Sequence, residues 1–144
     1  SIRFARLSND VQVTTIEYDL DRYIKAKENF ELCGLNDRIT AINDDALVHD
    51  FKDQQFDLIF IDAAKAQYIK FFEKYKANLA EGGVFISDNL SFHGMVDDLS
   101  LTHNYSTKKL VKKIQKYVEF LKTNTEFETE FFEIGDRIGV SKRK

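Results

Sequence analysis

The chain has 144 residues, of which 43% are hydrophobic, and a formal net charge of −3 at pH 7. This length and apolar content suit one globular domain with a buried core, and the small negative charge excludes a global electrostatic attraction to nucleic acid. The single cysteine, Cys33, excludes an internal disulfide and a thiolate metal cluster within one chain. Because no apolar run reaches the roughly 20 residues that span a bilayer and no signal sequence opens the chain, we expect a cytoplasmic protein.

The first half of the chain predicts alternating helices and strands. Residues 1–7 have the apolar spacing of a helix that is already under way at Ser1, and a second helix is expected from about Asp19 to the stop signal at Gly34. Three strands are expected, each ending in acidic or amide residues: 11–16 before Glu17, 39–42 before Asn43 to Asp45, and 56–61 before Asp62. The last is almost wholly apolar, which is typical of a strand covered on both faces.

The second half continues the alternation and then changes. A helix after Asp62 is predicted to present Tyr68, Phe71, Phe72, Tyr75 and Leu79 on one apolar face. Residues 81–83 are expected to form the turn into a strand over 84–87, which ends at Asp88 and Asn89. After a looser stretch over 90–105, the apolar spacing from Leu110 to Leu121 predicts a long amphipathic helix. Residues 127–134 and 138–141 then predict a closing hairpin.

This order of elements predicts an α/β fold, a doubly wound sheet that is mostly parallel and ends in a C-terminal antiparallel hairpin, within one domain over residues 1–144. Ligands of such sheets bind beyond the carboxyl ends of the strands. If the strands over 56–61 and 84–87 are neighbours, Asp62 and Asp88 end about 5 Å apart. With Asn89 they offer three oxygens to a divalent cation such as Mg²⁺, whereas each acid alone could simply cap a helix.

Three other residues at this edge have candidate roles. Glu17 is placed to accept hydrogen bonds from the ribose hydroxyls of a nucleotide cofactor. Asp45 is placed to meet an adenine edge, although residues 43–45 could equally be a polar turn. Lys65 lies three residues beyond Asp62 and could reach both cation and substrate as a general base, the alternative being a surface lysine.

Three segments resemble a known family: IEYD around Glu17, FDLIFIDAAKAQY over 56–68 and GGVFISDN over 82–89. They are similar to the cation-dependent O-methyltransferases of the catechol and caffeoyl-coenzyme A type, and particularly to small bacterial members such as tRNA 5-hydroxyuridine methyltransferases. The resemblance implies a Rossmann-like class I methyltransferase that uses S-adenosylmethionine. It also implies a homodimer for the full-length protein.

The resemblance assigns roles residue by residue. Asp62, Asp88 and Asn89 would ligate Mg²⁺ or Mn²⁺, and Lys65 would be the catalytic base. Glu17 would hold the cofactor ribose, Asp45 with Ala46 would border the adenine, and Asp62 would lie against the cofactor as well. The methyl acceptor would be a hydroxyl, either 5-hydroxyuridine in tRNA or a small catechol-like phenol.

The sequence departs from the family in three places. The first strand and its glycine-rich loop are expected to be missing, which would make the domain incomplete at its N-terminus. Asp44 stands where glycine is common, and Arg137 replaces the last glycine of a closing GDG turn. Two alternatives stay: a nicotinamide oxidoreductase, which would share the fold and the ribose acid but leaves the DAAK and SDN segments unexplained, and a truncated, non-catalytic module. The five lysines over 108–116 could contact RNA phosphates or form a solvated helix face.

Overall fold

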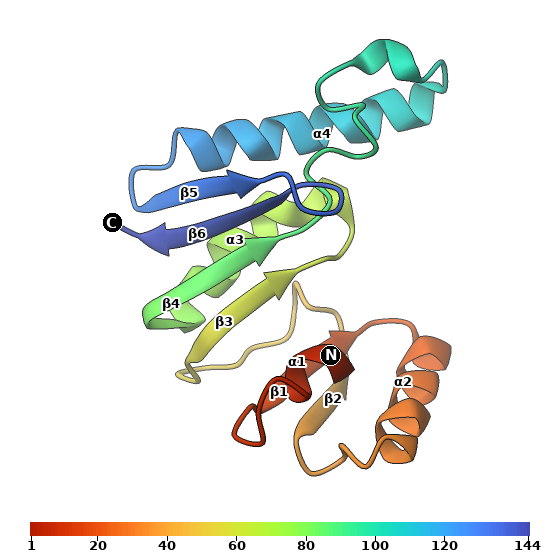
Figure 1. Ribbon diagram of the computed structural model, residues 1–144, viewed down its shortest axis with the longest axis vertical. Coiled ribbons are helices and arrows are strands. Elements are labelled where there is room, and N and C mark those ends of the chain that lie inside the picture. The colour runs from red at the N-terminus through yellow and green to blue at the C-terminus, as the bar shows by residue number, and fades with distance from the viewer. The chain divides into compact units, whose positions relative to one another are not determined.

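Residues 1–50 of the computed structural model, which describes residues 1–144 throughout, form one unit by themselves (Figure 1). Its elements in chain order are α1 (Ile2–Ala5), β1 (Val13–Glu17), α2 (Leu20–Leu32) and β2 (Ile39–Asn43). The two strands are parallel and in register from Val13 beside Ile39 to Glu17 beside Asn43. The carboxyl ends of both strands therefore carry polar side chains next to each other.

Helix α2 is bounded by the signals expected from the sequence. The Asp19 carboxylate caps its first turn by accepting a hydrogen bond of 2.9 Å from the Arg22 amide. Gly34, with a φ of +67°, lies just after the last turn, in a conformation that a side chain would disfavour. Phe30 is buried on the inner face of the helix with Ile39, so packing against the sheet fixes the helix.

Residues 51–144 form a second unit around a four-stranded sheet. Its strands lie in the order β3-β4-β6-β5, with β3 parallel to β4 and the other two pairs antiparallel. The elements, in chain order, are β3 (Phe56–Ile61), the 3₁₀ turn η1 (Lys65–Gln67), α3 (Tyr68–Tyr75), η2 (Lys76–Asn78), β4 (Leu79–Ser87), η3 (Leu99–Leu101), α4 (Tyr105–Lys122), β5 (Phe127–Phe132) and β6 (Ile138–Arg143). The parallel strands and the closing hairpin confirm the α/β class expected from the sequence.

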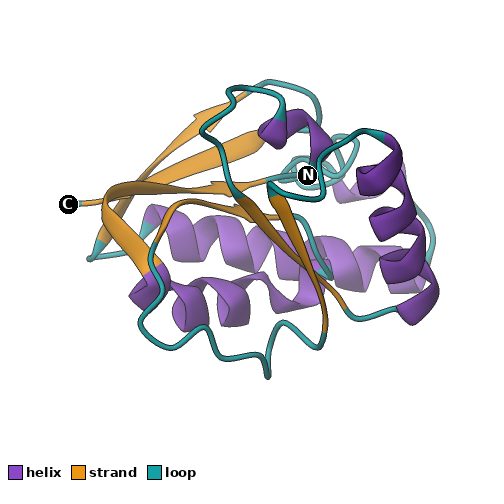
Figure 2. Cartoon of the chain, turned by 90° about the horizontal axis from the view of Figure 1, so that it is seen from below, coloured by secondary structure: helices purple, strands orange, loops and turns teal.

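Aromatic rings form the core of the second unit. Phe72 of α3 stacks on Phe85 of β4 with ring centroids 4.3 Å apart, and Phe127 of β5 meets both rings edge-on. Phe72 also contacts Phe120 of α4 at 5.4 Å, so both helices lie along the same face of the sheet (Figure 2). No helix in the chain combines the length and the apolarity that crossing a membrane would require.

The start of β4 differs from the expectation. Leu79 was expected on a helix face and the following glycines in a turn, but β4 already begins at Leu79, which pairs with Phe56. The register then shifts between Phe56 and Leu58, and a Cβ added to Gly83 would lie 2.9 Å from the Asp57 carbonyl oxygen of β3 and 2.9 Å from the Ala80 carbonyl oxygen of β4 itself. The glycine therefore serves a close backbone approach within a sheet rather than a turn.

Two further expectations about this region are wrong. Leu58 and Phe60 of β3 expose 39% and 40% of their surface, so the strand is not covered on both faces. The helix expected directly after Asp62 begins later, because residues 62–64 are irregular and the first 3₁₀ turn starts at Lys65.

Candidate functional site

The carboxyl ends of β3 and β4 gather polar side chains around the ammonium group of Lys65. Its Nζ donates hydrogen bonds to the Asn89 side-chain oxygen at 2.8 Å, to the Tyr68 hydroxyl at 2.8 Å and to Asp62 Oδ1 at 3.2 Å. The Lys65 side chain is only 16% exposed, whereas that of Asp62 is 48% exposed. The structure thus brings three of the predicted site residues to one point and adds Tyr68.

The sheet explains why these residues meet. One hydrogen bond beyond the paired strands, from the Asp88 amide to the Ile61 carbonyl at 3.2 Å, keeps the residues after β3 and β4 side by side. Asn89 has a left-handed φ of 59°, and its amide donates to the Asp88 carboxylate at 2.7 Å. This sharp bend turns the Asn89 side chain back toward Lys65. The backbone of Asp88 is held beside β3 by the bond to Ile61, and the Asp88 carboxylate accepts the hydrogen bond from the Asn89 amide at the bend.

Tyr68 is the site residue that the sequence did not reveal, because its spacing predicts only a core position. It is indeed 1% exposed, but its hydroxyl accepts from Lys65 and donates to the Asp88 carbonyl at 3.1 Å. Burial, and then the negative charge of Asp62, raise the pKa of Tyr68, so the hydroxyl stays protonated and can donate. Tyr68 therefore links the Lys65 ammonium to the end of β4.

The oxygens around the Lys65 ammonium group indicate which side chains could surround a cation at this position. The ammonium group stands in for a positive ion, and the Asp62 and Asn89 oxygens both lie within hydrogen-bond distance of it. Two carboxylates and an amide are hard oxygen donors, which suit Mg²⁺ or Mn²⁺. The chain has no cluster of three or more His, Cys, Asp or Glu side chains placed to hold a metal. The Asp62 and Asn89 oxygens face one positive centre, whereas the Asp88 carboxylate accepts from the Asn89 amide, so a hard cation here would need further ligands from solvent or substrate.

In the first unit, Glu17 lies at the carboxyl end of β1 beside a cavity of about 450 Å³. Its carboxylate accepts a hydrogen bond of 3.0 Å from the Asp19 amide, and it is half-buried. Asn43 of the neighbouring strand donates to the Glu17 carbonyl at 2.8 Å and to the Tyr18 carbonyl at 3.1 Å. This tie fixes the end of β1. The half-exposed carboxylate fits a ligand that presents hydroxyl donors, as a ribose does.

Asp45 and Ala46 lie in a turn just after β2. The Asp45 carboxylate accepts a hydrogen bond of 2.8 Å from the Leu47 amide, and its carbonyl accepts from the amides of Val48 and His49. This is the polar turn that the sequence allowed as an alternative. It leaves the assignment of Asp45 and Ala46 to an adenine edge as a prediction.

Comparison with known proteins gives the family. The model of the O-methyltransferase family matches residues 3–144. A caffeoyl-CoA O-methyltransferase of Populus kitakamiensis is 25% identical over 144 residues, a match that covers 95% of this chain and 61% of that protein. The chain thus spans about three fifths of the length of this relative.

Two solved structures are similar over nearly the whole chain. A provisionally named caffeoyl-CoA O-methyltransferase from Staphylococcus aureus is 36% identical with a TM-score of 0.93, and the match covers 99% of this chain and 69% of that one. An O-methyltransferase from Bacillus cereus in complex with S-adenosylhomocysteine is 25% identical with a TM-score of 0.77, covering 92% and 63%. These similarities confirm the class I methyltransferase fold. Together with the family model, they show that the chain belongs to the O-methyltransferase family.

Proposed function

We propose that this chain transfers a methyl group from S-adenosylmethionine to an acceptor hydroxyl with the help of Mg²⁺ or Mn²⁺. The observation that carries the proposal is the convergence of Asp62, Asn89 and Tyr68 on the Lys65 ammonium, at 2.8–3.2 Å. Lys65 has hydrogen-bond partners on three sides and lies at the ligand-binding edge of a parallel pair of strands. This environment favours a catalytic role for Lys65 over that of a solvated surface lysine.

Asp62, Asp88 and Asn89 would hold the cation. A bound divalent cation lowers the pKa of a coordinated hydroxyl and orients it. Asp62 and Asn89 already direct oxygens at one positive centre. Asp88 would add a second negative charge, which a cation would compensate.

Lys65 would act as a neutral amine, after its ammonium group has released one proton to solvent, and Nζ would then take the proton of the acceptor hydroxyl. A general base must come within about 2.6–3.2 Å of its proton donor, and Nζ already makes hydrogen bonds of this length. Tyr68 would hold Lys65 in this position. Because the Tyr68 hydroxyl donates its hydrogen bond to the Asp88 carbonyl, its oxygen is left to accept from Nζ, which favours one orientation of the lysine.

The resemblance assigns Glu17 to the ribose of the cofactor, Asp45 and Ala46 to its adenine, and Asp62 to cofactor binding as well. When bound, the cofactor would supply a methyl group on a sulfonium; the acceptor oxygen would bond to the methyl carbon while the carbon–sulfur bond breaks and S-adenosylhomocysteine leaves. Support comes from the half-buried Glu17 carboxylate at its strand end and from the similar Bacillus cereus structure, which holds S-adenosylhomocysteine. Homodimer formation stays a prediction of the resemblance.

The acceptor is either a nucleotide of RNA or a small phenol with neighbouring oxygens. The exposed face of α4 supports RNA: Lys109, Lys112, Lys113 and Lys116 are exposed, Lys108 is half-buried, and none of them forms an ion pair. The similarity to a caffeoyl-CoA O-methyltransferase supports a phenol.

The test is a methyl-transfer assay on the intact protein with labelled S-adenosylmethionine, comparing hypomodified tRNA with catechol, with and without Mg²⁺. We expect turnover with one acceptor and its loss on chelation. Asp62→Ala should abolish the metal-dependent turnover, whereas Asp57→Ala, which removes an exposed acid from the same strand, should not. Full turnover by Asp62→Ala would refute the cation site.

A further inference from the structure

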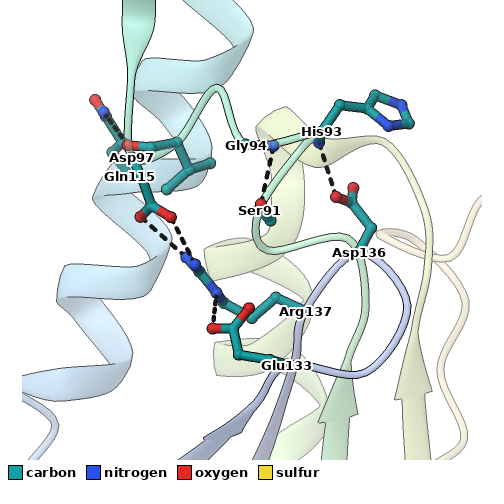
Figure 3. Close-up of polar contacts among 9 residues, drawn as sticks. Ser91, His93, Gly94, Asp97, Gln115, Glu133, Asp136 and Arg137 are labelled. Carbon is teal, nitrogen blue, oxygen red and sulfur yellow. Dashed lines mark hydrogen bonds and ion pairs between the residues drawn. The ribbon is translucent and has the colours of Figure 1, made fainter.

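The segment that follows Asn89 is wound into a strained shape. We name residues 90–98 the acceptor loop, because the loop starts directly after this candidate cation ligand. Phe92 and His93 have left-handed φ angles of 48° and 58°, which side chains disfavour. Within the loop the Gly94 amide donates to the Ser91 hydroxyl at 3.0 Å (Figure 3). Strained backbone of this kind persists only where surrounding contacts hold it.

The turn between β5 and β6 supplies these contacts. The Leu90 amide donates to the Arg137 carbonyl and the Ser91 amide to the Asp136 carbonyl, both at 3.0 Å. The Asp136 carboxylate also accepts from the His93 amide at 2.7 Å, as Figure 3 shows. The first half of the acceptor loop is therefore fixed by main-chain groups and by Asp136.

The second half of the loop is held by the Arg137 side chain. Its guanidinium makes two hydrogen bonds to the Asp97 carboxylate, at 2.6 and 3.1 Å, and its Nε donates to Glu133 at 2.7 Å (Figure 3). The Arg137 side chain is 17% exposed although both acids are largely exposed. Two parallel bonds fix the carboxylate in direction as well as distance. Gln115 of α4 adds a hydrogen bond of 2.8 Å to the Val96 carbonyl.

The backbone conformation of Arg137 is strained for a residue that carries a side chain. Arg137 has a left-handed φ of 63°, a conformation that glycine would adopt without strain. Folding of the turn alone would thus favour glycine at this position. The guanidinium must contribute something that offsets the strain, and its contacts run to the acceptor loop.

We propose that Arg137 is a positioning residue that latches the acceptor loop through Asp97 and so sets how the acceptor is held beside Asn89. The inference rests on the proposed function, because it takes Asn89 as part of the acceptor site. An acceptor whose reacting oxygen lies near the Asn89 side chain would also contact the acceptor loop, because the loop follows Asn89 directly in the chain. Displacement of such a wall by about 1 Å is enough to weaken productive binding.

Arg137→Gly separates this role from a purely structural one. The variant relieves the strained φ, so the urea midpoint of unfolding should not fall. It also removes the latch, so amide hydrogen exchange over residues 90–98 should become roughly threefold to tenfold faster. With Mg²⁺ and S-adenosylhomocysteine present, the dissociation constant for catechol or hypomodified tRNA should rise by a similar factor. The KM of the acceptor should rise more than kcat falls.

A charge swap is the matched control. The triple variant Asp97→Arg, Arg137→Asp and Glu133→Gln rebuilds the ion pair in the opposite direction and leaves no like charge beside the new aspartate, and aspartate tolerates a left-handed φ better than most residues. It should partly restore slow exchange in the loop and acceptor binding. Arg137→Lys keeps the charge but cannot make two parallel bonds, so it should not restore slow exchange.

Unchanged loop exchange in Arg137→Gly would overturn the latch. Faster exchange with unchanged acceptor binding would overturn its role in the site. If the unmodified protein binds neither acceptor and transfers no methyl group, the proposed function fails, while loop exchange in Arg137→Gly still decides whether the latch exists.

Discussion

Replacing Tyr68 with phenylalanine tests whether its hydroxyl serves the site or only the core. Tyr68→Phe keeps the ring, which packs edge-on against Tyr117 with centroids 5.1 Å apart. It removes one bond from a charged donor, Lys65, and one to the Asp88 carbonyl. Because that carbonyl loses this donor at a partly buried position, we expect the free energy of unfolding to fall by about 1–3 kcal/mol.

Tyr117→Phe is the matched control for this change. Tyr117 is also fully buried and also loses one hydroxyl, but its partner at 2.6 Å is the buried Ser87 side chain rather than Lys65. We expect a similar loss of about 1–3 kcal/mol in the free energy of unfolding. Urea unfolding followed by circular dichroism would measure both variants.

The two variants should differ in activity. Tyr68→Phe frees Lys65 to adopt other orientations, so methyl transfer at saturating acceptor should fall by on the order of tenfold or more. Tyr117→Phe leaves all contacts of Lys65 in place and should stay within about twofold of the unmodified protein at a temperature where both are folded. Equal losses of activity in both variants would refute a special role for the Tyr68 hydroxyl, as would a stability change below about 0.5 kcal/mol in Tyr68→Phe.

Three further results follow from the structure. Lys65→Met removes the ammonium group that competes for the Asp62 oxygen. The Mn²⁺ affinity of this variant, measured by electron paramagnetic resonance, should therefore stay the same or rise while turnover is lost. Asp62→Asn should instead lower the Mn²⁺ affinity roughly tenfold or more. Gly83→Ala places a Cβ 2.9 Å from two backbone oxygens and should destabilise the protein by about 1–3 kcal/mol in urea unfolding. Gly82→Ala meets nothing within 4 Å but has a φ of +75°, so it should cost about 1–2 kcal/mol through backbone strain instead. The hydrogen bonds from Arg137 hold the pKa of Asp97 below its usual value, so the latch is fully present above about pH 4, the ordinary aspartate value. Protection of the loop amides, taken relative to the intrinsic exchange rate at each pH, should fall only as the pH drops below that value.

Much of the fold can be read from the sequence because local signals agree with packing. The bounds of β3, the start of α2 near Asp19 and the presence of a closing hairpin match the expectation, although the hairpin strands end at Phe132 and Arg143 rather than at 134 and 141. The early start of β4 could not be predicted, because a Gly82–Gly83 pair signals a turn from local preference alone. Only the approach of β3 shows that Gly83 is needed for space.

The sequence predicts those residues of the candidate site whose chemical type and position at the end of a strand are distinctive. Asp62, Lys65 and Asn89 meet as expected, since parallel strands end at one edge. Tyr68 was counted as core because its partner is a backbone carbonyl, which has no sequence signal. The pair of Arg137 and Asp97 lies 40 residues apart in the chain, and its formation depends on two loops whose shapes no local pattern specifies.

The place of β6 in the sheet has a consequence for biosynthesis. This strand is made after the other three, yet it lies between β4 and β5. Neither of those strands can complete its pairing until residue 143 has been synthesised, so a nascent or truncated chain that stops before Ile138 presents two unsatisfied strand edges. Premature termination in this region should therefore give aggregation rather than a smaller folded product.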